Sequence, residues 1–228
     1  MKYLFFLLIS LRALSDPIRI AIVDMGIDKS EVGYNIVKSK ETEGIDYAKR
    51  IINSYHGTYI ANSYKKEYGD KIQIIDIVYS DGTGPSKRLQ KYRFPERKIE
   101  LIRKERIEEE IDHNIYLSFK KAIELKANII NFSSSIEKDR LYIREIIRDN
   151  PEVIFIVSAG NMSRNLDLEK NYPCSYKYKN VICVGSNDEY SNYGNDVDFK
   201  YKSIEHKGTS FLTFKALGPI LLELKKKK

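Results

Sequence analysis

Five short runs rich in Ile and Val recur along the chain, and each has the length of one strand. They occupy residues 18–24, 71–79, 128–133, 152–160 and 180–186. Most of these runs are continuously apolar and do not alternate with polar positions. This pattern is typical of strands in a parallel sheet that is covered on both faces.

Segments with a helical pattern lie between and after these runs, at residues 57–68, 115–126, 139–149 and 209–225. Strands that alternate with helices predict an α/β domain with a mainly parallel sheet. A further segment, residues 95–112, is dense in charge and has only five apolar positions. We expect it to form a solvated surface helix, supported by pairs of opposite charge one turn apart.

Composition excludes several classes of protein. With 42% hydrophobic and 31% charged residues among 228, the chain is too apolar to be disordered and long enough for one core. The net charge of +7 has no basic stripe interleaved with aromatic residues, so no nucleic-acid partner is expected. One compact monomeric domain is the simplest expectation.

The N-terminus resembles a secretory signal peptide. Lys2 precedes a mostly apolar run at residues 3–11, and small residues follow up to Ser15. The run is about half the length of a bilayer span, so stable membrane insertion is not expected. We therefore expect residues 1–15 to be removed and residues 16–228 to form the mature domain, secreted or periplasmic. The alternative is that the run forms a buried strand or helix.

Two cysteines, Cys174 and Cys183, are too few for a disulfide scaffold or a four-cysteine zinc site. The pattern around them favours two small buried side chains in or near a strand. The alternative is a disulfide, if the compartment is oxidising. No cofactor is expected, and no cluster of Asp and Asn has a spacing that would place a structural calcium ion.

Three polar residues stand where open parallel sheets place their sites, at strand ends and helix starts. Asp24 ends the first apolar run, His56 begins a helical segment, and Ser210 begins the last one. Taken singly, each has an ordinary structural explanation, because Asp often caps helices and Gly-Thr-Ser is common in turns.

Taken together, the three motifs resemble those of the subtilisin-like serine proteases, the subtilases. IAIVDMGID holds Asp24, HGTYIAN holds His56 and GTSF holds Ser210, in the Asp, His, Ser order of that family. IIDIVYSDGTG, NIINFSSS, IVSAGN and YPCSYKYKNVICVGS resemble further blocks of the family, so the similarity runs from about residue 18 to 218. The resemblance implies a three-layer sandwich around a mainly parallel central sheet.

The resemblance also implies roles for individual residues. Ser210 would be the nucleophile, His56 the general base, Asp24 its orienting carboxylate and Asn161 a donor to the oxyanion. The residues expected to contact a peptide or protein substrate lie in two segments: Phe132, Ser133, Ser134, Ser135, Ser158, Ala159 and Gly160. His113 lies at the end of the charged segment and His206 lies four residues before Ser210, so neither is expected to be the base.

Several positions depart from the family pattern. Met25 replaces a hydroxyl residue, Tyr59 replaces a histidine, and Leu212 and Phe214 replace an alanine and a proline after the serine. Leu212 is expected to overpack its helix by about 1–3 kcal/mol unless its neighbours are small. Two functions therefore stand: an exported serine endopeptidase that works through an acyl-enzyme, or a subtilase-fold protein that binds peptides or a partner without efficient cleavage.

Overall fold

The computed structural model describes residues 17–28, 36–38, 55–79, 97–203 and 205–225. The predicted signal segment, residues 1–15, lies outside these ranges, as does its alternative as a buried N-terminal element. The loop that follows the second apolar run is likewise outside them from residue 80 onward.

A seven-stranded sheet forms the middle of the fold, and all neighbouring strands pair in parallel. The strands are β1 (Ile18–Asp24), β2 (Ile36–Lys38), β3 (Ile72–Val78), β4 (Ile129–Phe132), β5 (Ile154–Ser158), β6 (Val181–Ser186) and β7 (Phe199–Tyr201). Their order is β2-β3-β1-β4-β5-β6-β7. The five predicted strands are confirmed. The edge strands β2 and β7, of three residues each, are too short to give a sequence pattern.

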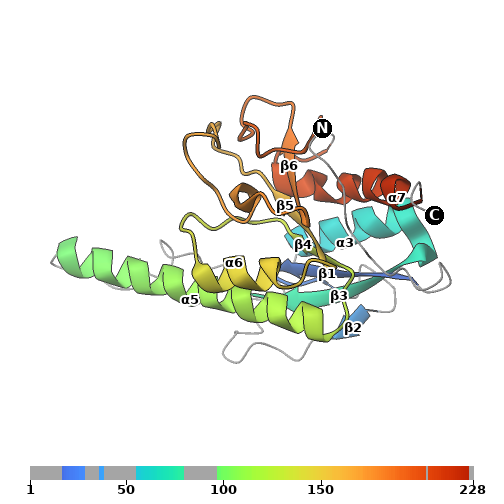
Figure 1. The fold of residues 1–228 in the computed structure, drawn as a ribbon, viewed down its shortest axis with the longest axis horizontal. Helices are drawn as coiled ribbons and strands as arrows, with labels where there is room; N and C mark the ends of the chain where they lie inside the picture. Colours follow the sequence, from blue (N-terminus) through green and yellow to red (C-terminus); the bar gives the residue numbers. More distant parts are fainter. Residues whose placement is uncertain (1–16, 29–35, 39–54, 80–96, 204, 226–228) are drawn as a thin grey trace.

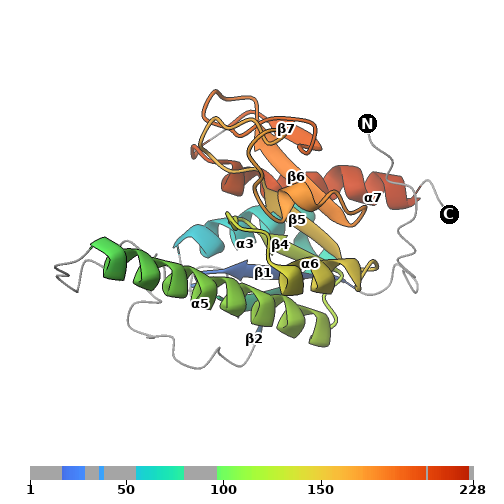
Figure 2. The same ribbon diagram turned by 60° about the vertical axis from the view of Figure 1, so that its left-hand side comes forward.

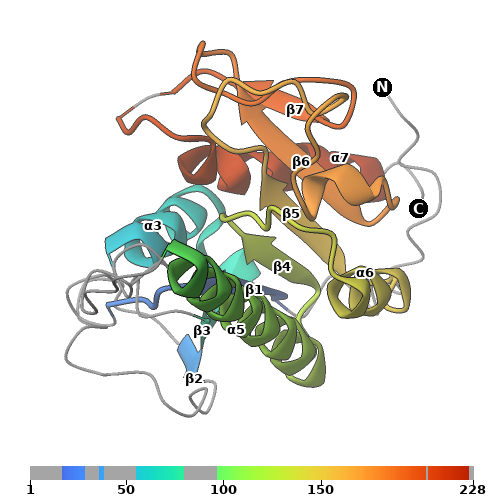
Figure 3. The ribbon, with the colours of Figure 1, turned by 90° about the vertical axis from the view of Figure 1, so that its left-hand side faces the viewer.

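Helices cover both faces of this sheet, as Figure 3 shows. The helices are α3 (Tyr55–Tyr68), α5 (Arg97–Glu124), α6 (Leu141–Arg148) and α7 (Leu217–Lys225), with short 3₁₀ helices η1 (Gly69–Lys71), η2 (Cys174–Tyr176) and η3 (Thr209–Ala216). Successive residues of β1 belong to different cores. Ile20 and Ile22 pack with α3 and α7, whereas Ala21 and Val23 pack with α5 and α6. The predicted three-layer α/β sandwich, with a parallel central sheet, is confirmed.

Helix α5 is longer than predicted. The charge-dense segment and the helix expected after it form one continuous helix of 28 residues. Its N-terminal part extends beyond the sheet in Figures 1 and 2. Between residues 105 and 112 ion pairs connect the helix to the chain before α6; the shortest are Lys138 to Glu105 at 3.0 Å and Arg140 to Asp112 at 2.7 Å. In the described ranges no helix combines the length and the apolar character needed to cross a bilayer.

The last predicted helix, residues 209–225, is divided in two. It starts as the eight-residue 3₁₀ helix η3 and becomes α-helical only at Leu217. A side chain competes with the helical pattern here, because the Thr213 hydroxyl donates to the Ser210 carbonyl at 3.1 Å. Ser, Thr and Phe are also weaker helix formers than the Leu-rich segment that follows.

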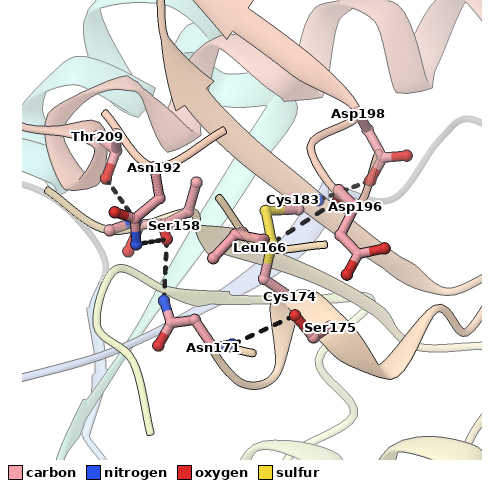
Figure 4. The surroundings of a disulfide bond; sticks show 12 residues. Ser158, Leu166, Asn171, Cys174, Ser175, Cys183, Asn192, Asp196, Asp198 and Thr209 are labelled. Atoms are coloured by element: carbon pink, nitrogen blue, oxygen red, sulfur yellow. Dashed lines mark hydrogen bonds between the residues drawn. A yellow bond between two sulfur atoms is a disulfide. The ribbon is translucent and has the colours of Figure 1, made fainter. Parts of the chain in front are cut away.

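The two cysteines are joined by a disulfide, shown in Figure 4, with their Cα atoms 5.1 Å apart. The expectation of two unpaired side chains was wrong, although both residues are buried as expected. The bond connects η2 to β6. The Val181 amide donates to the Tyr178 carbonyl in a turn that returns the chain from η2 to β6. Sequence spacing alone does not reveal such a turn.

Candidate active site

Asp24 and His56 are in direct contact. Asp24 is the last residue of β1 and only 4% exposed, while His56 is the second residue of α3. The His56 Nδ1 atom lies 2.8 Å from Asp24 Oδ2, and the Met25 amide donates to Oδ1 at 2.8 Å. Because an ionised carboxylate can only accept, Nδ1 carries the proton and Nε2 is left as the acceptor of the neutral ring. This arrangement suits a general base.

The residues after His56 explain how α3 comes so close to β1. A Cβ atom at Gly57 would clash with the Gly26 carbonyl oxygen and would lie 3.2 Å from Asp24 Cβ. The Thr58 hydroxyl accepts a hydrogen bond of 2.7 Å from the Asp28 amide. The sequence His-Gly-Thr therefore places the imidazole, allows the close approach and anchors the helix start.

Tyr79, which lies near Asp24, has a perturbed pKa. Tyr79 follows β3, and its amide donates to the Asp24 carbonyl at 3.1 Å. Burial, together with the negative charge of Asp24, raises the pKa of Tyr79 to about 12. Its phenol therefore stays protonated, so it adds no second negative charge beside Asp24.

Ser210 is the second residue of η3 and is 8% exposed. Its carbonyl accepts from Thr213, whose hydroxyl lies 3.0 Å from that of Ser133. The chain of hydrogen bonds continues from Ser133 to Asn131 at 2.8 Å and on to the Tyr64 hydroxyl at 2.9 Å. This buried chain connects the turn that carries Ser210 to β4 and α3.

The fold brings Ser210 and His56 onto packed elements, since η3 lies against α3. Phe211, the residue after Ser210, has its ring 4.9 Å from the His56 imidazole. No hydrogen bond joins the hydroxyl of Ser210 to His56, both of which the structure describes. Catalytic hydrogen bonds are often long in free enzymes and shorten when substrate binds. The structure therefore places the two residues on adjacent elements, but without a hydrogen bond between their side chains.

Asn161 follows β5 and is held by one end of its side chain. Its Oδ1 atom accepts from the Thr209 amide at 2.8 Å and from the Thr209 hydroxyl at 3.1 Å. Thr209 Oγ1 in turn accepts from the Gly160 amide at 3.1 Å. The NH₂ group of Asn161 makes no hydrogen bond within the described residues, so it is available to a ligand. The sequence identified Asn161 but not Thr209, which orients it.

The two segments expected to contact substrate lie side by side after β4 and β5, where Phe132 pairs with Val157. The Ser158 hydroxyl donates to the Ser134 carbonyl at 3.4 Å, which connects them. The buried members of the set are Phe132, Ser133, Ser158 and Ala159. Ser134 and Gly160 are partly exposed and Ser135 is exposed, so these three remain the most accessible.

Two asparagines that the sequence did not single out fix the chain before Asn161. The amide groups of Asn171 and Asn192 both donate to the Ala159 carbonyl, at 2.9 and 2.8 Å, as part of the surroundings drawn in Figure 4. A Cβ atom at Gly160, whose φ is +99°, would collide with the Asn192 amide. Asparagine is common in loops, so nothing in the sequence pattern marks these two.

A second network holds the chain just before Ser210. The Tyr190 hydroxyl accepts from the Gly208 amide at 2.9 Å and is hydrogen-bonded to Ser203. Asp188 accepts from the Ser186 hydroxyl, the Ser203 amide and the Tyr190 hydroxyl. These hydrogen bonds, led by the one from Ser186, lower the pKa of Asp188 to about 2. The carboxylate is therefore ionised at neutral pH, and it fixes the approach to η3.

Leu212, which replaces a smaller residue of the family pattern, is packed into the interior. Its side chain is 2% exposed and belongs to the core between the sheet and α3. Ala61 and Ala216 belong to the same core, but so do larger residues such as Ile60 and Tyr64, so the expected overpacking stays a prediction. Across the described part of the chain, no group of three or more His, Cys, Asp or Glu side chains could hold a metal ion.

Comparison with known proteins gives one family and a set of similar folds. The sequence profile of the subtilase family matches residues 15–209 and so ends immediately before Ser210. No curated protein matches the chain.

Among solved structures, the prenylagaramide maturation protease PagA is 18% identical with a TM-score of 0.59, covering 95% of this chain and 79% of that one. MycP1 from Mycobacterium smegmatis is 15% identical with a TM-score of 0.60, and the match covers 90% of this chain and 68% of the MycP1 chain. The self-cleaved protease domain of PatA is 16% identical with a TM-score of 0.58, covering 88% and 77%. At these identities the likeness shows a shared fold.

Proposed function

Because the chain belongs to the subtilase family and has its protease fold, we propose that it is a serine endopeptidase that uses Asp24, His56 and Ser210. The observation that carries this proposal is the bond of 2.8 Å between the Asp24 carboxylate and the His56 imidazole. It leaves Nε2 as the proton acceptor, on a helix that packs against the element bearing Ser210. The expected substrate is a peptide or protein chain, and the enzyme would act as a monomer.

In the proposed reaction, Ser210 Oγ attacks the carbonyl carbon of a peptide bond while His56 Nε2 takes the hydroxyl proton. Asp24 holds the ring and stabilises the imidazolium that forms. The C–N bond then breaks, and His56 gives its proton to the leaving amine. Water attacks the acyl-enzyme with His56 again as base, and Ser210 regains its proton when the carboxylic acid leaves.

Negative charge develops on the carbonyl oxygen in both steps. The unbonded NH₂ of Asn161 supports its role as donor to this oxygen, because Thr209 already occupies the Oδ1 end of the side chain. A backbone amide at the start of η3 would be the second donor. The loss of one such donor typically raises the barrier by about 2.7–4 kcal/mol.

A fluorophosphonate probe tests this proposal directly, because it labels only a serine that a neighbouring base activates. We expect the wild-type protein to be labelled at Ser210, as mass spectrometry of the modified peptide would establish. Ser210→Ala is the matched control and should not be labelled. An unlabelled wild-type protein that hydrolyses no casein would reject the enzyme.

Two observations favour a second candidate, a subtilase-fold protein that binds peptides without efficient cleavage. The Ser210 hydroxyl and His56 are not hydrogen-bonded, and Met25 occupies the position after Asp24 where the family usually has a hydroxyl residue. A protein of this kind would retain peptide affinity in a binding titration although no product forms. The labelling experiment separates the two candidates.

We also propose that the protein is exported, secreted or periplasmic, after removal of residues 1–15. The disulfide between Cys174 and Cys183 supports this, because such bonds persist in oxidising compartments. N-terminal sequencing of the recovered protein should begin at Asp16. Recovery of a cytoplasmic protein with Met1 intact and both thiols free would contradict export.

A further inference from the structure

Five ring-bearing side chains gather where α3 begins. Tyr55, His56 and Tyr59 come from α3, while His206 and Phe211 come from the chain that enters and starts η3. Each of the five contacts at least one ring from the other element. The cluster therefore joins the element that carries His56 to the element that carries Ser210.

His206 contacts three other members of this cluster. Its Nε2 atom is hydrogen-bonded to the Tyr55 hydroxyl at 2.9 Å. Its ring lies edge-on to Tyr59, with centroids 4.6 Å apart and planes at 86°, and 5.0 Å from the ring of Phe211. Both distances are within the range preferred by interacting aromatic rings. The side chain is thus held in place by three neighbours.

Phe211 transmits this contact to His56. Its ring is 4.9 Å from the imidazole at 60° and 5.2 Å from Tyr59 at 90°. The bond from Asp24 fixes one atom of the imidazole, Nδ1, but a single hydrogen bond leaves the ring free to tilt about it. Phe211 limits that tilt from the side, and His206 with Tyr59 limits the movement of Phe211.

We propose that His206 is a positioning residue, which holds Phe211 against the His56 imidazole so that the ring keeps one orientation relative to Ser210. This inference rests on the proposed function for its effect on catalysis. The orientation of the imidazole is a property of the fold and can be measured without turnover. Among the described residues, His206 contacts Phe211 but neither Asp24 nor Ser210, so it acts through Phe211.

The variants separate the ring of His206 from its hydrogen bond. His206→Ala removes both, and we expect kcat and the rate of fluorophosphonate labelling to fall by between about tenfold and about 100-fold, with KM little changed. His206→Phe and Tyr55→Phe each keep a ring but lose the hydrogen bond. We therefore expect kcat and the labelling rate to fall by only about two- to tenfold in each. The double variant should lose no more than either single one, because both remove the same bond.

The decisive readout is the NMR signal of the proton between Asp24 and His56. In His206→Ala this signal should shift or broaden, whereas His206→Phe should preserve most of it. His113→Ala is the matched control, since that exposed histidine also contacts two tyrosines but lies on α5, and it should change neither signal nor rate. Thermal unfolding verifies that each variant is folded.

An unchanged His56 proton signal in folded His206→Ala would overturn the positioning role, whatever the labelling rate. Absence of labelling in the wild-type protein would instead reject the proposed function, and the NMR comparison would still decide the positioning. If His206→Ala does not fold, the comparison of His206→Phe with Tyr55→Phe replaces it. If kcat and the labelling rate fall by unequal factors in those two variants, the proposal would be overturned.

Discussion

Asp24 and His56 meet through one direct bond between side chains, made where β1 ends and α3 begins. Ser210 and Asn161 are held differently, through Thr209, Thr213 and the loops on either side of β6. The first pair is joined by one bond between its own side chains, with Phe211 packed beside the ring, while the second depends on hydrogen bonds from distant segments. Substitutions in the first pair should therefore change chemistry alone, and those around the second should change chemistry and fold together.

The largest effect is expected when any member of the proposed triad is removed. Ser210→Ala or His56→Ala should each lower kcat by about 10⁶, and Asp24→Ala by somewhat less, because the groups act as one unit. For the same reason double variants should lose little more. Steady-state hydrolysis of a chromogenic peptide measures this, and losses that add on a logarithmic scale would argue against a triad.

Asp24→Asn tests the direct bond of the first pair. The amide has almost the same shape but favours the wrong tautomer of His56, so the rate should fall by about 10⁴ with the fold intact. Kinetics together with circular dichroism would measure both properties. Hydrolysis at the wild-type rate would remove His56 from its role as base.

Asn161 tests the second pair. Asn161→Asp retains an oxygen that accepts from Thr209 but loses the NH₂ donor, so kcat should fall by about 10²–10³ at nearly constant stability. Asn161→Ala should lose a similar factor in kcat and also unfold at a lower urea concentration. Equal stability of the two variants would mean that the bond to Thr209 contributes little to the fold.

The smallest effect is expected at Asp188, whose carboxylate supports the entry to η3 from a distance. Its pKa is lowered to about 2 from an ordinary value of 3.8, so it stabilises the fold above pH about 4. This contribution is lost as the pH falls through about 2. Asp188→Asn should therefore be less stable than wild type at neutral pH, and the difference should shrink between about pH 4 and about pH 2.

Urea unfolding at several pH values measures that difference. Labelling of Ser210 should slow slightly in Asp188→Asn, while the NMR signal of the Asp24–His56 proton stays unchanged. A stability difference that is constant down to pH about 2 would show that the carboxylate charge is not what stabilises the segment.

The sequence was informative where a residue type has few structural uses. Continuous Ile and Val runs located five strands, because only a sheet covered on both faces buries such runs completely. The motif around His56 was recognisable through its resemblance to the subtilase motif, and the structure gives a reason for its glycine, because the close approach to Gly26 leaves no room for a side chain at Gly57. Residues that work through ordinary hydrogen bonds, such as Thr209, Asn171 and Asn192, resemble any loop residue and were missed.

Other features depended on distances that no local pattern encodes. The pairing of Cys174 with Cys183 follows from the turn between η2 and β6, which the sequence does not reveal. The sequence gives no role to His206, because it lies close to Ser210 along the chain. In the folded protein it instead packs across to Tyr55 and Tyr59 on α3.

The order of the strands has a consequence for the time course of folding. β1 pairs with β3 on one side and with β4 on the other, and the sheet then grows through β5 to β7 in chain order. Sheets built from such non-local parallel pairings form slowly. Ser210 comes after all seven strands in the sequence. The element that carries it, η3, can therefore pack against α3 only after the strands have been made. If Ser210 is the nucleophile, as proposed above, a newly made copy would lack it beside His56 while its strands are still exposed, and unfinished copies would not be expected to cleave one another.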